Sequence, residues 1–256
     1  MRGGSNVRDR VALGLRSAWL RQAGWTGLGA VARFDGILVT LTGLLEPTLN
    51  VGFVEWPPAD PGAALLAAQA WFEANGQRIG LDVERGRHPQ VESAAARLGL
   101  SPVVSRPGMA RAVPRPAGGP WPPGVSIRAV RDGTDLDAVR ALQREVFGLP
   151  TRVATGFLPP IVLRTPGFRL LLATLDGEPA GSAGVHLDHG AAGIMGVATL
   201  PAARRRGIGT ALTVGCLAHA AEEGCDLAWL QSEPAARTIY DRLGFEVVSE
   251  WVVWTR

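Results

Sequence analysis

The sequence contains no lysine, a single tyrosine and only two cysteines among its 256 residues. Cys216 and Cys225 lack the spacing of metal ligands and are too few for a disulfide framework, so we expect no metal site and no structural disulfide. No apolar run reaches the roughly 18 residues that suggest a membrane-spanning helix. The N-terminus is polar and arginine-rich, unlike a signal peptide. These absences predict a cytoplasmic protein with no metal and no membrane partner.

The balance of charge argues against nucleic acid as a partner. The 26 basic residues, all arginine, exceed the 23 acidic residues only slightly, and the net charge is +3. No arginine-rich stretch is interleaved with stacking aromatic residues, so we expect no nucleic-acid binding. A small basic excess suits a small anionic ligand instead. The hydrophobic fraction of 46% supports a packed core, and the length is comfortable for two domains of about 120 to 130 residues.

The most informative stretch runs from Gly193 to Leu212. It combines an apolar strand, a turn at Pro201, three consecutive arginines, and a Gly-x-Gly step into an amphipathic helix. Gly207 and Gly209 carry no side chains, so a ligand can approach the N–H groups of the first helical turn. Those donors, the positive end of the helix dipole and the arginines together predict an anion site that suits a pyrophosphate.

The same stretch resembles a family signature. Arg204-Arg205-Arg206-Gly207-Ile208-Gly209 is similar to the Arg/Gln-x-x-Gly-x-Gly/Ala motif of the GNAT superfamily of acyl-CoA-dependent N-acyltransferases. The resemblance extends from about Ser126 to Trp254. Within it, Ser232 to Phe245 looks like the family's second motif, with its tyrosine and its Leu-Gly-Phe ending. The resemblance implies an α/β (α+β) GNAT fold, in which helices flank a mixed central sheet.

The resemblance also implies acetyl-CoA as co-substrate and no metal. In the family, the backbone of the splayed strand before the signature pairs with the pantetheine amides, and the loop amides hold the pyrophosphate. These cofactor-binding roles fall on Val197, Ala198, Thr199, Arg204, Arg205, Arg206, Gly207, Ile208, Gly209 and Thr210. Ser232 matches a position that is often asparagine in the family, and its hydroxyl is expected to contact CoA as well.

The implied reaction is direct attack of a neutral amine on the acyl thioester through a tetrahedral intermediate. Backbone N–H groups near Val197 would polarise the thioester carbonyl, as in the family. Tyr240 stands where the family places its general acid, and its phenol is protonated at neutral pH and can donate to sulfur. The alternative is that Tyr240 is only a packed aromatic residue. Candidate general bases are His186, Glu145 and Glu233, and a water chain is the alternative to all three.

The first half of the chain repeats the order of elements found in the second. A shift of 145 residues places Gly62 on Gly207, Pro89 on Pro234, and Arg97-Leu98-Gly99 on Arg242-Leu243-Gly244. This match predicts a tandem duplication. After an amphipathic helix at 6–22, the first copy is predicted to have strands at 36–41, 49–55, 78–84 and 102–105 and helices at 61–75 and 89–98.

The first copy lacks the chemical groups of the second. Ala59, Asp60 and Pro61 occupy the places of the three arginines. An aspartate puts negative charge where the pyrophosphate would lie, and a proline removes an N–H donor. Ala95 stands where Tyr240 stands in the second copy. We therefore expect the first copy to keep the fold without the chemistry, so that each chain binds one cofactor.

The predicted organisation is a degenerate GNAT-like domain at 1–113, a Pro/Gly linker at 114–124 and a catalytic GNAT domain at 125–256. The expected function is N-acetyl transfer from acetyl-CoA to a primary amine of a small molecule or peptide. The alternative is a non-catalytic acyl-CoA-binding sensor or regulatory module. The acceptor amine, the acyl chain length and the oligomeric state stay open at this point.

Overall fold

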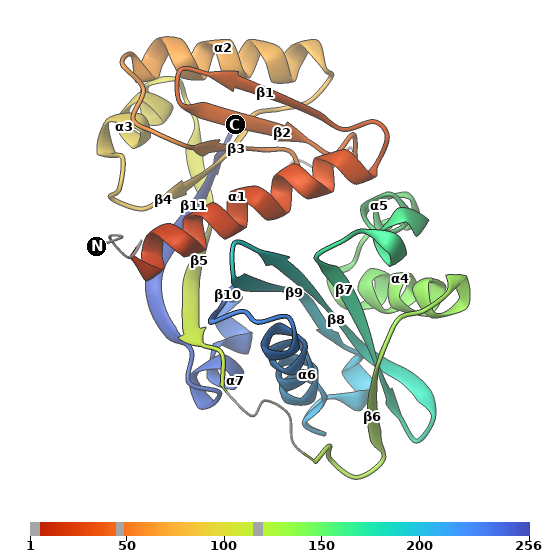
Figure 1. The fold of residues 1–256 in the computed structure, drawn as a ribbon. Coiled ribbons are helices and arrows are strands. Elements are labelled where there is room, and N and C mark those ends of the chain that lie inside the picture. The colour runs from red at the N-terminus through yellow and green to blue at the C-terminus, as the bar shows by residue number, and fades with distance from the viewer. Residues whose placement is uncertain (1–5, 45–48, 115–119) are drawn as a thin grey trace. The chain divides into compact units, whose positions relative to one another are not determined.

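The computed structural model forms two compact units that interleave along the chain (Figure 1). It describes residues 6–44, 49–114 and 120–256. We call the first unit the signature unit; it consists of the described residues up to Ala18 and of Met109–Glu246. We call the second the companion unit; it consists of Trp19–Gly108 and Val247–Arg256.

Three elements contribute residues to both units: α1 (Val7–Trp25), β5 (Ser101–Ala112) and β11 (Glu246–Thr255). The predicted domain limits are those of the two sequence copies, whereas the units are the parts of the chain that pack compactly. The boundaries of the units therefore differ from the predicted domain limits. The domain limits stay a prediction.

The signature unit is built on antiparallel strands to which one parallel strand is added. Its strands after β5 are β6 (Val125–Ala129), β7 (Phe168–Leu175), β8 (Glu178–Asp188), β9 (Ala191–Thr199) and β10 (Leu227–Gln231). Its remaining helices are α4 (Gly133–Phe147), α5 (Thr151–Phe157), α6 (Ile208–Glu222) and α7 (Arg237–Arg242), with 3-10 turns η2 (Pro160–Arg164), η3 (Pro201–Ala203) and η4 (Pro234–Ala236). The strands lie in the order β10-β9-β8-β7-β6, and only the β9–β10 pair is parallel.

Two-residue turns connect the central strands. Asp176 and Gly177 have φ angles of 52° and 90°, and His189 and Gly190 have φ angles of 47° and 71°. Positive φ at both central residues is the conformation that tight hairpins require. The turns fix the register of β7, β8 and β9, and through it the position of every residue on the sheet.

Helices α6 and α4 cover opposite faces of this sheet. A Cβ atom built on Gly181 would lie 2.8 Å from Ile208 and 3.1 Å from Leu212, both on α6. The next residue, Ser182, accepts a hydrogen bond from Gln143 on α4 at 3.0 Å. Because successive side chains of a strand point to opposite faces, β8 is sandwiched between the two helices.

The first part of α1 belongs to the signature unit and is held there by packing and charge. The guanidinium of Arg10 contacts the Asp226 carboxylate at 2.5 Å and the carbonyl oxygen of Gly190 at 3.2 Å. Gly14 lies against the indole of the buried Trp229, where any Cβ would come within 2.5 Å of the ring nitrogen. Only glycine fits this close approach.

The companion unit has its own sheet and its own core. Its strands are β1 (Ala30–Phe34), β2 (Ile37–Leu41), β3 (Val51–Val54) and β4 (Gly80–Glu84), and its helices after α1 are α2 (Pro61–Ala74) and α3 (Pro89–Arg97). The strands lie in the order β1-β2-β3-β4-β11-β5. Leu65, Ala68 and Phe72 of α2 are buried in the core.

Two features of the companion unit differ from the sequence prediction. Strand β1 was not predicted, because its alternating, half-exposed pattern follows a glycine-rich stretch. Strand β5 extends to Ala112, well past the predicted end at Ser105. The last strand, β11, pairs antiparallel with β4 from Trp251↔Glu84 to Thr255↔Gly80.

Candidate functional site

The loop that leads into α6 has an unusual backbone. Arg205 has a φ of 62° and Gly207 a φ of 77°, and Arg206 between them has a negative φ. A positive φ is uncommon for a residue other than glycine. Left-handed residues alternating with right-handed ones turn successive N–H groups toward one concavity, which is how backbone anion sites are formed.

The start of α6 leaves its N–H donors available. The first helical hydrogen bond runs from the N–H of Ala211 to the carbonyl oxygen of Gly207 at 2.9 Å. The N–H groups of Ile208, Gly209 and Thr210 therefore precede the hydrogen bonding of the helix itself. Gly207 is the N-cap and has no side chain with which to cap them.

The charge around this helix start is positive. The side chains of Arg204, Arg205 and Arg206 are exposed, and the Nε of Arg204 donates to the carbonyl oxygen of Thr199 at 3.4 Å. The helix dipole adds a partial positive charge at the same place. Together with the donors of the first turn, these groups suit a bound anion at the predicted anion site.

Beside the loop, strands β9 and β10 part. Their last pair joins Gly193 to Trp229, although β9 continues to Thr199 and β10 to Gln231. Among the described residues, β10 supplies no partner for the edge of β9 beyond Gly193. The other edge of β9 stays paired with β8 up to Thr199↔Gly181. The edge that faces β10 therefore offers backbone donors and acceptors to a ligand.

A bulge in β9 lies in this open stretch. Gly184 pairs with Met195 and Ser182 with Ala198, so that Gly196 and Val197 oppose the single residue Ala183. Gly196 has a φ of 59° and is exposed in the middle of the strand. Bulges of this kind redirect backbone groups and occur beside functional sites.

Gln143 supports the bulge, although it is not among the residues that the sequence predicts for the site. Its Nε2 donates to the carbonyl oxygen of Gly196 at 2.7 Å and to the Oγ of Ser182 at 3.0 Å. The side chains of Gln143 and Ser182 are both buried. The available signal was the spacing, because Gln143 follows Val139 by four residues and so lies on the apolar face of α4.

Tyr240 lies in the core of the signature unit. Its ring is buried and meets that of Phe245 edge-on, at a centroid distance of 6.0 Å and an interplanar angle of 74°. Burial, with a smaller effect of Cys216, raises the pKa of Tyr240 to about 12. The phenol is therefore protonated at neutral pH, as a proton donor must be.

The remaining predicted residues lie at different distances from the opening. Ser232 is buried, and its Oγ donates to the carbonyl oxygen of Glu233 at 2.8 Å. Glu233 itself is exposed just after β10, and Glu145 is exposed on α4. His186 is buried and pairs with Gly193, which at about 3.3 Å per residue is roughly 10 Å along β9 from the start of the bulge at Gly196. A base at His186 would need a proton relay.

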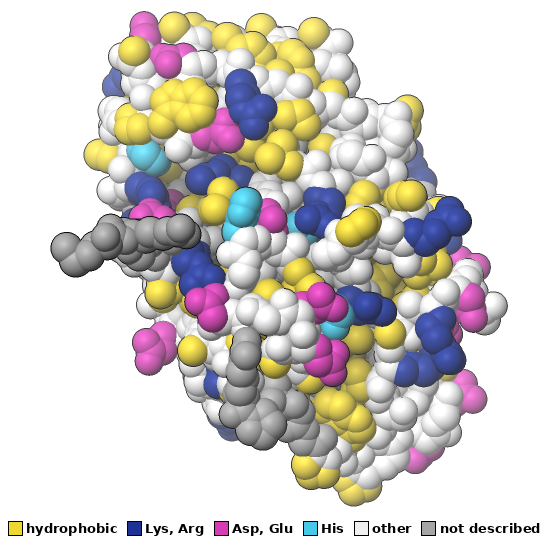
Figure 2. Space-filling model, in the orientation of Figure 1, with side chains coloured by type: hydrophobic (Ala, Val, Ile, Leu, Met, Phe, Trp, Pro, Cys, Tyr) yellow, Lys and Arg dark blue, Asp and Glu magenta, His cyan; other side chains and the backbone are white. Residues whose placement is uncertain are grey.

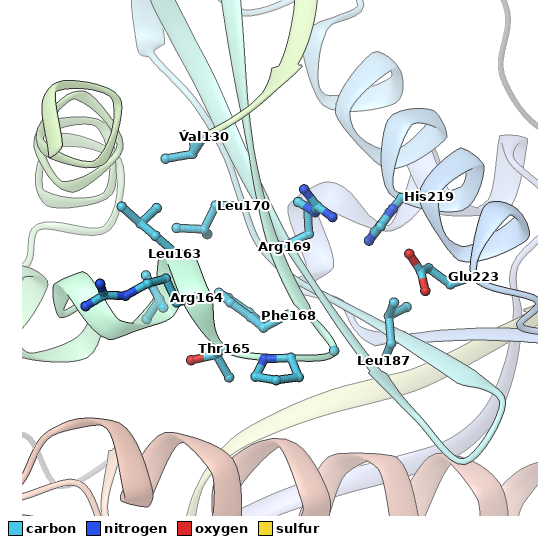
Figure 3. Close-up of a pocket in the computed structure, with 13 residues that line it drawn as sticks. Val130, Leu163, Arg164, Thr165, Phe168, Arg169, Leu170, Leu187, His219 and Glu223 are labelled. Carbon is cyan, nitrogen blue, oxygen red and sulfur yellow. The ribbon is translucent and has the colours of Figure 1, made fainter. Parts of the chain in front are cut away.

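Two cavities of the signature unit lie away from this opening. One, of about 230 Å³, lies where Arg169 of β7, His219 of α6 and Glu223, which caps the end of α6, converge (Figure 3). The other, of about 310 Å³, shares these three residues. His219 is eleven residues after Ile208, or about 16 Å along the helix axis, so the cavities lie toward the opposite end of α6. We assign neither to the anion site.

Charges on the surface are mixed. Figure 2 shows arginine side chains interspersed with acidic ones on the visible face. In the part of the chain that the structure describes, no helix is long and apolar enough to cross a membrane. The described residues also contain no group of three or more His, Cys, Asp or Glu side chains that could hold a metal ion.

Comparison with known proteins gives one family-model match and several matches to solved structures. Residues 137–245 match the model of the acetyltransferase (GNAT) family. A GCN5-related N-acetyltransferase from Kribbella flavida matches over 96% of this chain and 94% of its own, with a TM-score of 0.77 and 22% identity. A second, from Sphaerobacter thermophilus, matches over 86% and 76%, with a TM-score of 0.67 and 20% identity. No curated protein sequence matches this chain.

A tandem GNAT protein from the clavulanic acid biosynthesis pathway also has this fold, over 90% of this chain and 83% of its own, with a TM-score of 0.61 and 18% identity. The structures define the fold, a mixed sheet flanked by helices in an arrangement that fits a tandem GNAT protein. Residues 137–245 belong to the acetyltransferase (GNAT) family. The predicted family and fold are confirmed, and the family supports acyl transfer as the class of activity.

Proposed function

We propose that this protein transfers an acetyl group from acetyl-CoA to a primary amine of a small molecule or peptide. The observation that carries the proposal is the opening between β9 and β10, directly before the glycine-opened start of α6. One ligand with amide groups at one end and a pyrophosphate at the other would satisfy both sets of donors. Acetyl-CoA has this structure.

In this proposal the chain holds the co-substrate mainly with its backbone. Val197, Ala198 and Thr199 would pair with the pantetheine amides, because the edge of β9 that they occupy has lost its partner strand. The N–H groups from Arg204 to Thr210 would hold the pyrophosphate, with the exposed arginines neutralising its charge. Ser232, just beyond the open end of β10, would contact the arm from the other side.

The proposed reaction forms a C–N bond and breaks the C–S bond. A neutral amine attacks the thioester carbonyl, backbone N–H groups near Val197 stabilise the oxygen of the tetrahedral intermediate, and Tyr240 gives its proton to the leaving thiolate. The buried, protonated phenol supports this role. The proton of the amine would leave through Glu233, through Glu145, through His186 by a relay, or through water.

We further propose that only the second sequence copy, 125–256, binds acetyl-CoA, and that 1–113 is a degenerate copy joined to it by 114–124. The start of α2 supports this asymmetry. The Asp60 carboxylate accepts a hydrogen bond from the N–H of Ala63 at 3.0 Å, and Pro61 has no N–H to offer. An anion from solution would meet a carboxylate there.

Two measurements test the function. Isothermal titration with acetyl-CoA should give one site per chain, and release of free thiol from acetyl-CoA should depend on an added amine from a panel of amino acids, polyamines and short peptides. Two sites per chain would contradict the proposed organisation. One tight site without thiol release for any amine would favour a sensor or regulatory module over an enzyme.

A further inference from the structure

Gln231 lies at the opening between β9 and β10. It is the last residue of β10 and follows the final β9–β10 pair, Gly193 with Trp229, by two positions. If the same parallel register continued, Gln231 would stand opposite Met195, where the strands have parted. Its side chain is therefore next to the path that we propose for acyl-CoA.

The side chain of Gln231 also belongs to a defined face of the sheet. Ala228 and Leu230 pack in the core beneath α6. Because side chains alternate along a strand, Trp229 and Gln231 point to the opposite face. This is the face on which Gln143 of α4 supports the bulge. Gln231 thus faces away from the helix that carries the anion site.

The amide nitrogen of Gln231 is a donor without an acceptor. Its Nε2 is fully buried, and no described residue accepts a hydrogen bond from it. Native proteins rarely leave a buried donor unsatisfied, because its interaction with water has been lost without replacement. Gln143 shows the usual outcome, since its Nε2 donates at both 2.7 and 3.0 Å.

We infer that the side-chain amide of Gln231 donates a hydrogen bond to a carbonyl oxygen of acyl-CoA bound between β9 and β10. The inference rests on the proposed function. A neutral amide matches a neutral carbonyl oxygen, whereas phosphate groups are served by arginines and helix donors. Acyl-CoA presents two kinds of carbonyl along this path, those of the pantetheine amides and that of the thioester.

Titration of the full-length chain with CoA and with acetyl-CoA distinguishes the two kinds of carbonyl, the pantetheine amides and the thioester. Gln231→Met keeps much of the side-chain shape and removes the donor. If Gln231 bonds the thioester carbonyl, the variant should lose about tenfold in affinity for acetyl-CoA and none for CoA. If it bonds a pantetheine amide, both affinities should fall by the same factor. Wild-type affinity for both ligands would overturn the inference.

Thermal unfolding supplies a matched control. Gln143→Met removes a donor that already has partners, so its unfolding midpoint should fall. Gln231→Met removes a donor that has none in the free protein, so its midpoint should be no lower than that of the wild type. A fall as large as that of Gln143→Met would mean a structural role and would overturn the inference.

The outcomes also distinguish this inference from the proposed function. If the wild-type chain binds neither CoA nor acetyl-CoA, the proposed function fails and the inference fails with it. If the wild type binds and the Gln231 variant is unchanged, only the inference fails. The side-chain amide resonances of Gln231, assigned by their absence from Gln231→Met, should shift on addition of CoA or acetyl-CoA to the wild type.

Discussion

Helices α6 and α2 stand at equivalent points of the two sequence copies, yet their first turns find their hydrogen-bond partners differently. At α2, the Asp60 carboxylate accepts from the N–H of Ala63 at 3.0 Å, and the Asp35 carboxylate accepts from the N–H of Ala59 at 2.8 Å. At α6, Gly207 offers no such group. Every helix start needs acceptors for its donors. A side chain caps the start of α2, whereas no side chain caps the start of α6.

The same contrast extends to the position of the predicted general acid. Tyr240 packs edge-on against Phe245 in the signature unit, whereas Ala95, its counterpart by the sequence shift, is fully buried in the companion unit. An alanine preserves the packing of a helix on a sheet and removes the phenol. This difference supports the proposal that the first copy keeps the fold without the chemistry.

The largest effect is expected from Tyr240→Phe, because phenylalanine, like Ala95 in the first copy, has no phenol to donate a proton. If the phenol is the general acid, the single-turnover rate of acetyl transfer should fall by about 10²-fold with the affinity for acetyl-CoA unchanged. Rapid-quench measurement of the chemical step is required, because product release can mask it. A wild-type rate in the variant would leave Tyr240 with packing alone.

Gly209→Val narrows the start of α6 more than the alanine that the family motif accepts at this position. A Cβ atom at Gly209 would lie 3.5 Å from the Cδ1 of Ile239 and 3.8 Å from the Oγ1 of Thr199, which are ordinary contacts. The fold should therefore be kept, while the affinity for acetyl-CoA falls by about tenfold or more, since the two further methyl groups of valine stand where the ligand approaches.

Gly133→Val is the matched control for that substitution. It also adds a valine side chain in the first turn of a helix, α4, but in open space. Its affinity for acetyl-CoA should equal that of the wild type. Calorimetric titration of both variants provides the comparison, and an unchanged affinity in folded Gly209→Val would contradict the site.

Alkaline pH should weaken the signature unit through Tyr240. The folded-state pKa is raised from 10.0 to about 12, so the phenol ionises first in the unfolded chain. This stabilising contribution is complete below pH 10 and is lost as the pH rises toward 12. Near pH 11 the loss is about 1.4 kcal/mol. Denaturant unfolding at pH 9 and 11 should show a smaller decrease for Tyr240→Phe than for the wild type.

The smallest effect concerns Asp60. Asp60→Ala should lower the free energy of unfolding by about 1 kcal/mol through the loss of an N-cap, and Asp60→Ser should restore much of it. Neither variant should gain a second acetyl-CoA site, because Pro61 still lacks an N–H and Asp35 still binds the loop. Calorimetric stoichiometry checks this. A second site in Asp60→Ala would show that the Asp60 carboxylate alone prevents the first copy from binding acetyl-CoA.

The parts of the molecule that the sequence predicts are those that depend on local chemistry. The start of α6 and the start of α2 at Pro61 each follow from a few adjacent residues. The sequence shift then extends the pattern of helices to the first half. The Gly-x-Gly signature likewise predicts the family that the comparison confirms.

The parts that the sequence does not predict depend on distant segments. Gln143 matters only because β9 bulges opposite it, and Gln231 only because β10 parts from β9 at Trp229. Glutamine has no pattern that marks either role. The contribution of Gly14 likewise depends on the indole of a residue more than two hundred positions away.

The pairing of β11 with β4 has a consequence for synthesis on the ribosome. Val83 leaves the ribosome about 170 residues before its partner Val252. Until then β4 is an edge strand with unpaired backbone groups, which chaperones or other chains can bind. The companion unit is thus completed only after Glu246, the last residue of the signature unit, has been made. This slow step should be visible as protease sensitivity of nascent chains that end before Glu246.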